Sequence, residues 1–176
     1  MRHISLPDGF DGLLSLEAGE HVLLSGNVVT ARDAAHARIS SLLEAGMQLP
    51  FQLQRTLVYY MSPTAPAPGR VIGSAGPTTS SRMDRWMPAL LRAGLRATMG
   101  KGPRSKEVTA LHLEYGAVYL AAIGGAGALA STCIRGAVPL AWDDLGPERV
   151  LVLDLEDFPA FVAIDGSGRT IYPGGR

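Results

Sequence analysis

The chain has 176 residues, of which 47% are hydrophobic, and its mean hydropathy is +0.15. This length and composition predict one folded domain over residues 1–176 and argue against disorder. We expect an α/β fold. The 16 basic and 16 acidic residues cancel, so no net charge draws the chain to nucleic acid or to an anionic membrane, and we expect neither as a partner. No apolar run could span a bilayer and the N-terminus is not a signal peptide, so a cytoplasmic location is the default expectation.

Hydrophobic periodicity and turn residues predict the elements in chain order. The first half predicts irregular structure or an edge strand over 1–20, a strand over 21–29, a helix from 30 to about 45, a strand over 56–61, a rigid proline-rich excursion over 62–69, a short strand at 71–72 and a helix over about 83–95. The second half predicts a solvated basic loop over 96–106, a helix over 107–115, a strand over 117–123, a helix from 124 to about 134, strands over 138–142 and 149–153, and a hairpin over 160–172.

The stretch from Gly76 to Asp84 is predicted to be a strand-to-helix turn with several hydroxyl groups and one guanidinium. Thr78 and Thr79 stand at positions typical of helix N-caps, and free backbone amides at a helix start attract anions. Arg82 adds a planar fork that matches a carboxylate or a phosphate. Helix capping with a surface arginine and the binding of an anion are both compatible with this stretch.

A second arginine is predicted at the start of another helix. Thr30 is a plausible N-cap, and Asp33, three residues later, can complete a shortened capping box with it. This places Arg32 in the first turn of the predicted helix. A cation is disfavoured at the positive end of a helix, so Arg32 indicates a site for an incoming anion. His36, one turn later, is interpreted as a surface or partly packed histidine.

Lys101 is one of only two lysines, and it stands between two glycines in the basic loop. Such a lysine can bring its ammonium close to a ligand, although the composition of the loop alone favours simple solvation.

Two other patterns are weaker. The glycines at 124–127 resemble a dinucleotide turn, but tight packing of a strand against a helix explains them equally well. The acids Asp154, Glu156 and Asp157 could bind a metal, but solvation of a strand end is the preferred interpretation.

The constellation is a receptor for a small polyanion that lacks half of a catalytic site. No nucleophile–histidine pair, acid–base pair or metal-ligand set is recognisable in the sequence. The only cysteine, Cys133, excludes a disulfide framework and an iron–sulfur cluster built from this chain alone.

Several strings resemble those of a known family. They are SGNVVTARDAAH (25–36), GSAGPTTSSRMD (73–84), GKG (100–102), YGAVY (115–119), GGA (124–126) and EDFPA (156–160). Their order and spacing are similar to the beta subunit, or C-terminal domain, of the iron–sulfur (class I) fumarate hydratases and L(+)-tartrate dehydratases.

The resemblance implies a swivelling β/β/α domain that pairs with an alpha subunit, for which an α2β2 assembly is expected. A [4Fe–4S] cluster would be held by three cysteines of that partner, with the active site in the cleft between the subunits. Thr78 corresponds to the threonine proposed as catalytic base, Arg32 and Arg82 to arginines that bind the substrate carboxylates, and Lys101 to a lysine of the same pocket. Thr79 would contribute to substrate binding, and no residue of this chain would bind a metal.

The leading interpretation is therefore a beta subunit that hydrates fumarate reversibly to (S)-malate. Dehydration of L(+)-tartrate, or binding of a dicarboxylate without chemistry, remains an alternative. A nucleotide-binding protein built on residues 124–127 comes third.

Overall fold

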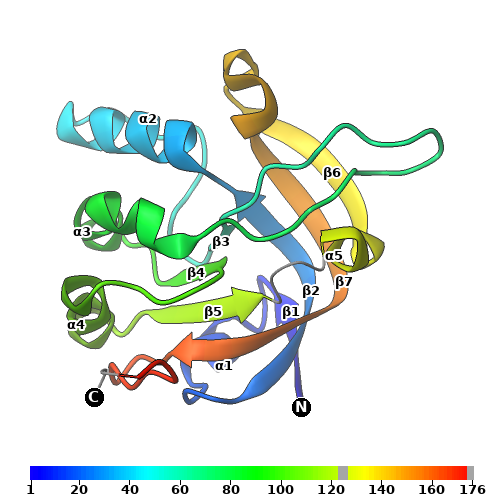
Figure 1. The fold of residues 1–176 in the computed structure, drawn as a ribbon. Coiled ribbons are helices and arrows are strands. Elements are labelled where there is room, and N and C mark those ends of the chain that lie inside the picture. Colours follow the sequence, from blue (N-terminus) through cyan, green and yellow to red (C-terminus); the bar gives the residue numbers. More distant parts are fainter. Residues whose placement is uncertain (123–126, 174–176) are drawn as a thin grey trace.

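The computed structural model describes residues 1–122 and 127–173 (Figure 1). The strands are β1 (Arg2–Leu6), β2 (His21–Thr30), β3 (Leu57–Tyr59), β4 (Ala97–Gly100), β5 (Val118–Ala122), β6 (Ile134–Ala141) and β7 (Val150–Ile164). The helices are α1 (Phe10–Leu14), α2 (Asp33–Glu44), α3 (Met87–Arg92), α4 (Lys106–Tyr115) and α5 (Gly127–Thr132), with 3₁₀ helices η1 (Ser80–Trp86) and η2 (Asp143–Glu148). None of the helices in these two described ranges is long and apolar enough to cross a membrane.

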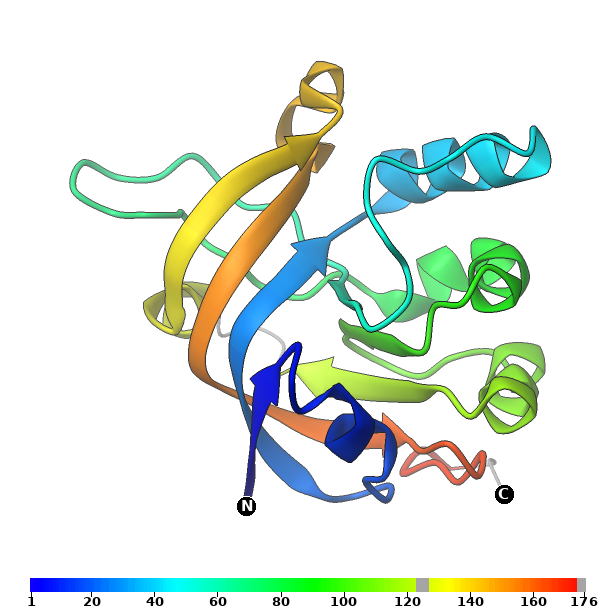
Figure 2. The same ribbon diagram turned by 180° about the vertical axis from the view of Figure 1, so that it is seen from behind.

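Five strands close into a barrel. Strands β2, β3, β4 and β5 are neighbours and run parallel, and β7 is antiparallel both to β5 and to β2, so it completes the ring. Strand β1 extends the sheet beside β2, and β6 extends it beside β7 (Figures 1 and 2). The prediction of one α/β domain fold is thus confirmed at the level of a mixed α/β barrel.

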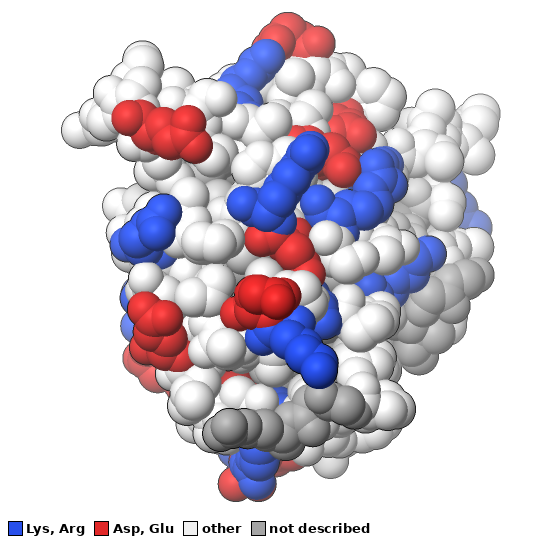
Figure 3. Space-filling view, turned by 60° about the vertical axis from the view of Figure 1, so that its left-hand side comes forward, with Lys and Arg blue, Asp and Glu red and all other residues white. Residues whose placement is uncertain are grey.

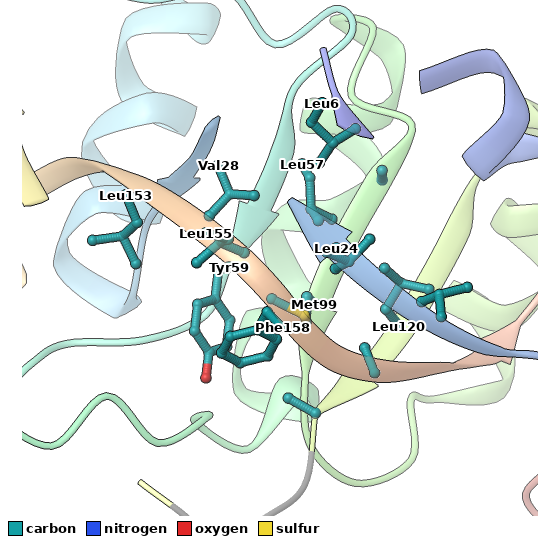
Figure 4. Close-up of a cluster of buried hydrophobic side chains, with 14 of the residues drawn as sticks. Leu6, Leu24, Val28, Leu57, Tyr59, Met99, Leu120, Leu153, Leu155 and Phe158 are labelled. Atoms are coloured by element: carbon teal, nitrogen blue, oxygen red, sulfur yellow. The ribbon is translucent and has the colours of Figure 1, made fainter. Parts of the chain in front are cut away.

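Side-chain alternation on the strands creates two cores. Leu57 and Tyr59 point into the barrel, where they meet Met99, Leu120 and other apolar side chains (Figure 4). Val58 and Tyr60, one residue out of phase, belong to a second core that includes side chains of α2 and α3. Helices α2, α3 and α4 stack along one side of the barrel, whereas α1 lies near β1 (Figures 1 and 2).

The largest correction concerns the predicted loop over 96–106. Residues 97–100 form the fully buried strand β4, paired on one side with β3 and on the other with β5. Its side chains are small or unbranched, so no apolar run marks it, and the strand is buried by its neighbours. The strand predicted at 71–72 is wrong, because Val71 is exposed and lies in an irregular segment.

Three boundaries also differ from the sequence prediction. The helix expected over 83–95 is a 3₁₀ helix followed by α3, and Pro88 stands in the first turn of α3, where its missing N–H costs nothing. The predicted strand at 149–153 and the first arm of the predicted hairpin are one continuous strand, β7. Thr30 is not an N-cap, because it ends β2 and its hydroxyl accepts a hydrogen bond from the Leu151 N–H at 3.0 Å.

Candidate active site

Three predicted site residues gather where parallel strands end. Arg32 follows β2, Lys101 follows β4, and the segment around Thr78 crosses the end of β3, where its N–H donates to the Tyr60 carbonyl at 2.7 Å. Because parallel strands present their carboxyl ends at one edge of a sheet, residues far apart in the chain meet there. This shared edge explains why motifs 20 to 70 residues apart contribute to one place.

The backbone of Thr78 and Thr79 is locked to that of Lys101. The Lys101 N–H donates to the Thr78 carbonyl at 3.1 Å, and the Ser80 N–H donates to the Lys101 carbonyl at 2.9 Å. Thr79 and Lys101 form a parallel bridge. Thr78 and Lys101 are half-buried and Thr79 is exposed, so all three remain accessible to solvent. No carboxylate in the described part of the chain forms an ion pair with the Lys101 ammonium.

Gly100 makes this pairing possible. A Cβ atom at Gly100 would lie 2.1 Å from Ser80 Oγ, 2.9 Å from Tyr60 Cδ2 and 3.2 Å from the Thr78 carbonyl oxygen. Glycine is therefore required for the close approach of the two segments.

The two predicted carboxylate-binding arginines meet at one carboxylate. Arg82 donates to Asp33 through Nε at 3.2 Å and Nη2 at 2.9 Å, and Nη2 of Arg32 lies 3.6 Å from the same carboxylate. The side chain of Arg32 is 23% exposed and that of Arg82 is 50% exposed. Asp33 therefore joins two segments that are almost 50 residues apart, which is a different role from the capping partner that its position in the sequence suggested.

A second carboxylate sits at the N-terminus of α2. Glu148 accepts the Ala34 N–H at 2.8 Å, and its other oxygen lies 3.5 Å from Arg32 Nη2. Nε of Arg32 is buried and has no hydrogen-bond partner among the described residues. The helix end and the guanidinium thus already hold an anion supplied by the protein itself, and one donor of the guanidinium is unused. On the face of the molecule that carries these helices, basic and acidic side chains are interspersed (Figure 3).

His36 is more deeply placed than the sequence suggested. It is fully buried, its Nδ1–H donates to the Arg32 carbonyl at 2.9 Å, and its ring packs on those of Tyr60 and Trp86. Burial lowers the pKa of His36 from 6.5 to about 4, so the imidazole is neutral at pH 7. Its hydrogen bond holds the backbone carbonyl of Arg32, the residue that immediately precedes α2.

The weaker candidates do not join this site. Residues 124–126 of the dinucleotide-like turn lie outside the described residues. Asp154, Glu156 and Asp157 lie within β7 instead of ending a strand, and Glu156 pairs with Arg135. The described ranges contain no group of three or more His, Cys, Asp or Glu side chains that could hold a metal ion.

A hollow of about 830 Å³ lies between α4 and residues 167–173, and none of the predicted site residues lines it. Sequence reasoning missed Glu148 because nothing nearby in the chain marks it, whereas Asp33 stood inside a recognised motif and could have been paired with an arginine.

Comparisons with known proteins show the family of this chain. The chain belongs to the family described as the fumarase C-terminus, whose model matches residues 3–175.

Among individual relatives, the chain is 39% identical over 156 residues to fumarate hydratase 2 of Leishmania major, a match that covers 88% of this chain and 28% of the relative. It is 36% identical over 151 residues to the anaerobic class I fumarate hydratase of Escherichia coli, covering 85% of this chain and 28% of the relative. It is also 37% identical over 163 residues to a putative L(+)-tartrate dehydratase subunit beta of Methanocaldococcus jannaschii, covering 89% and 84%. The chain therefore spans little more than a quarter of the fumarate hydratases and most of the beta subunit.

Proposed function

We propose that residues 1–176 are the beta-type domain of a hydro-lyase that hydrates fumarate reversibly to (S)-malate. The observation that supports this most directly is the convergence of Arg32 and Arg82 on one carboxylate, beside the locked Thr78–Lys101 segment. Two guanidinium groups at one edge suit a substrate with two carboxylates. Family membership supplies the reaction type.

In this proposal, Arg32 and Arg82 hold the substrate carboxylates. Arg82 already donates from Nε and Nη2 to Asp33, so a substrate carboxylate would bind its remaining N–H groups. Nε of Arg32 is buried, so Arg32 would meet the substrate through the part of its side chain that is exposed beside Asp33 and Glu148. Removal of a carbon-bound proton next to a carboxylate builds negative charge on that carboxylate. Guanidinium groups held in place beforehand stabilise this charge without further reorganisation, which lowers the barrier.

Thr78 is proposed as the base and Lys101 as a cation beside it, with Thr79 contributing to substrate binding. A threonine hydroxyl is a weak base, so it needs a nearby positive charge that favours its alkoxide. Lys101 is the candidate, because its backbone is bonded to that of Thr78 and its ammonium forms no ion pair within the described residues.

The remaining half of the site is proposed to come from an alpha subunit. The family's [4Fe–4S] cluster requires several thiolates, and Cys133, half-buried and packed against the barrel core, is a single thiol. The residues of this chain do not fit the cluster, so the proposal assigns it to the partner. An α2β2 assembly in the cytoplasm, with this domain swivelling against its partner, completes the proposal.

The main alternative substrate is L(+)-tartrate. It is favoured by one observation: the relative whose length this chain covers most fully among those described is named as a tartrate dehydratase beta subunit. A non-catalytic module that binds a dicarboxylate through Arg32 and Arg82 is the alternative of a different class.

The test is anaerobic co-expression with a candidate alpha subunit, followed by turnover assays with fumarate, (S)-malate and L(+)-tartrate. Turnover that needs both chains would support the hydro-lyase and identify its substrate. A stable complex that binds dicarboxylates but turns none over would favour the module.

A variant series on one residue then tests the base. Thr78→Val removes the hydroxyl with little change in shape and is expected to abolish turnover, whereas Thr78→Ser keeps the hydroxyl and should retain part of it. Thr132→Val removes an exposed hydroxyl that bonds only the Leu129 carbonyl among the described residues and serves as the matched control. Full turnover by Thr78→Val would remove Thr78 from the mechanism.

A further inference from the structure

Behind the Thr78–Lys101 segment lies a completely buried arginine. The side chain of Arg104 is 0% exposed, and its Nε donates to Asp84 at 2.5 Å. Its Nη1 donates to the Tyr60 hydroxyl at 3.3 Å, and the guanidinium carbon lies 5.4 Å and 5.2 Å from the ring centroids of Tyr60 and Tyr119. Burial of a guanidinium is costly, so four specific contacts around one cation indicate a function beyond filling space.

The strands explain why the cation fits there. Tyr119 lies on β5, and the backbone of Tyr60 continues the pairing of β3 with β4, since its N–H donates to the Met99 carbonyl at 2.8 Å. Gly100, on β4 between them, has no side chain, and Ser80 Oγ and the edge of the Tyr60 ring take that space. The guanidinium of Arg104 lies within cation–π distance of both rings.

The same groups hold the loop that carries Lys101. The Tyr119 hydroxyl donates to the Gly102 carbonyl at 2.8 Å and accepts from Ser80 Oγ at 2.9 Å. Asp84, the carboxylate partner of Arg104, also accepts the Ser105 N–H at 2.7 Å. The loop that follows Lys101 is thus tied at Gly102 and at Ser105 to residues that Arg104 contacts.

The connection also reaches Thr78. The Thr78 N–H donates to the Tyr60 carbonyl. Two residues later, the Ser80 hydroxyl donates to the Tyr119 hydroxyl, and the Ser80 N–H donates to the Lys101 carbonyl. Displacement of the Tyr119 ring would therefore disturb Ser80 and Gly102, which flank the paired Thr78 and Lys101 backbones.

Arg104 cannot be replaced by another basic residue without loss of this arrangement. Asp84 is the only carboxylate that pairs with Arg104 in the described ranges. Nη2 of Arg104 has no hydrogen-bond partner there, and the same is true of Nε2 in His36 and in His112. A lysine ammonium would keep the charge, but it could not lie flat between two rings and bond Asp84 and the Tyr60 hydroxyl at once.

We propose that Arg104 is a positioning residue for the reaction, which sets Lys101 and Thr78 in register through Tyr60, Tyr119 and Asp84. The inference rests on the proposed function for its catalytic consequence, and on the contacts above for its structural one. Arg104 does not touch the substrate.

The experiment compares two small changes with two matched controls. Arg104→Lys loses the planar fork, and Tyr119→Phe loses only the hydroxyl that holds Gly102. The controls are Arg96→Lys and Tyr115→Phe, because Arg96 lies 5.2 Å from the Tyr115 ring centroid in a second cation–π pair away from the site. All four are measured as complexes with the alpha subunit.

For Arg104→Lys and Tyr119→Phe we expect kcat to fall about 10- to 100-fold, as for a small misplacement of catalytic groups, while the controls keep the wild-type value. KM should change less than kcat. Amide hydrogen exchange of Lys101 and Gly102, measured on the chain itself, should become faster in the two site variants and not in the controls.

The outcomes separate this inference from the proposed function. If the wild-type complex is inactive, the hydro-lyase proposal fails, but faster exchange at Lys101 still supports the positioning role. An active wild type with unchanged kcat and unchanged exchange in both site variants overturns the role of Arg104. A loss of activity that only follows the fraction of unfolded protein in melting curves overturns it as well.

Discussion

Two buried histidines should make the stability of this protein fall as the medium becomes acidic. Burial lowers the pKa of His36 and of His112 from 6.5 to about 4, and in each ring Nδ1 donates to a backbone carbonyl one turn earlier. In the unfolded chain both imidazoles bind a proton near pH 6.5, whereas the folded state resists it until about pH 4. The unfolded state therefore binds more protons in this window, and the free energy of unfolding decreases as the pH falls through it.

The size of the effect follows from the same values. One proton difference changes the free energy of unfolding by about 1.4 kcal/mol per pH unit, so the two histidines together should cost about 3 kcal/mol between pH 6.5 and 5. That is a large share of the roughly 5–15 kcal/mol that stabilises a typical domain. Most carboxylates remain ionised above pH 5, so their protonation contributes little in this window.

The assay is urea unfolding at several pH values, followed by tryptophan fluorescence, since Trp86 packs on the His36 ring. His36→Asn and His112→Asn keep a side-chain N–H near the position of Nδ1 but cannot titrate. Each should be less stable at pH 7, yet lose only about half as much stability as the wild type between pH 6.5 and 5. His3→Asn, at an exposed position, is the control. An unchanged pH dependence in both core variants would refute the reasoning.

Three further substitutions test the fold around the site. Gly100→Ala places a methyl group 2.1 Å from Ser80 Oγ, so it should destabilise the chain by about 1–3 kcal/mol in urea unfolding and lower turnover; an unaltered midpoint would contradict the close approach. Thr30→Val leaves the Leu151 N–H buried without a partner and should cost about 1–3 kcal/mol by the same measurement, unlike Thr30→Ser, which keeps the acceptor. Arg135→Ala removes an exposed ion pair with Glu156 and an exposed hydrogen bond to the Thr132 carbonyl, so it should change the free energy of unfolding by less than about 1 kcal/mol; a larger loss would contradict the small value expected of such exposed contacts.

The sequence predicted an element correctly where the residues of that element carry a recognisable hydrophobic pattern. The strand around Leu57 and Tyr59 was recognised from its aromatic and β-branched residues, and the helix α2 from its apolar stripe. Strand β4 was missed because Ala97 to Gly100 carries small or flexible side chains, and only the pairing with β3 and β5 makes it a strand. Tertiary pairing of this kind has no local signature.

The candidate site shows the same division. The motifs identified Arg32, Thr78 and Lys101, and the structure brings them to one edge of the barrel, while their catalytic roles stay predictions. The shared use of Asp33 by two arginines depends on the approach of α2 to η1, which neither segment encodes alone. Arg104 was interpreted as part of a solvated loop, because composition counts charges but does not show the rings and the carboxylate that surround it.

The seam between β2 and β7 has a consequence for how the protein is made. Its paired residues, such as Val29 with Val152 and His21 with Phe161, are about 130 positions apart, so the ring closes through contacts that form slowly. On the ribosome, β2 emerges long before β7, so the edge of β2 that β7 will cover stays unpaired during synthesis. An unpaired strand edge can pair with other chains and so promotes aggregation. The order of synthesis therefore delays the finished strand-end surface, and any partner that recognises that surface meets it only after β7 has been added.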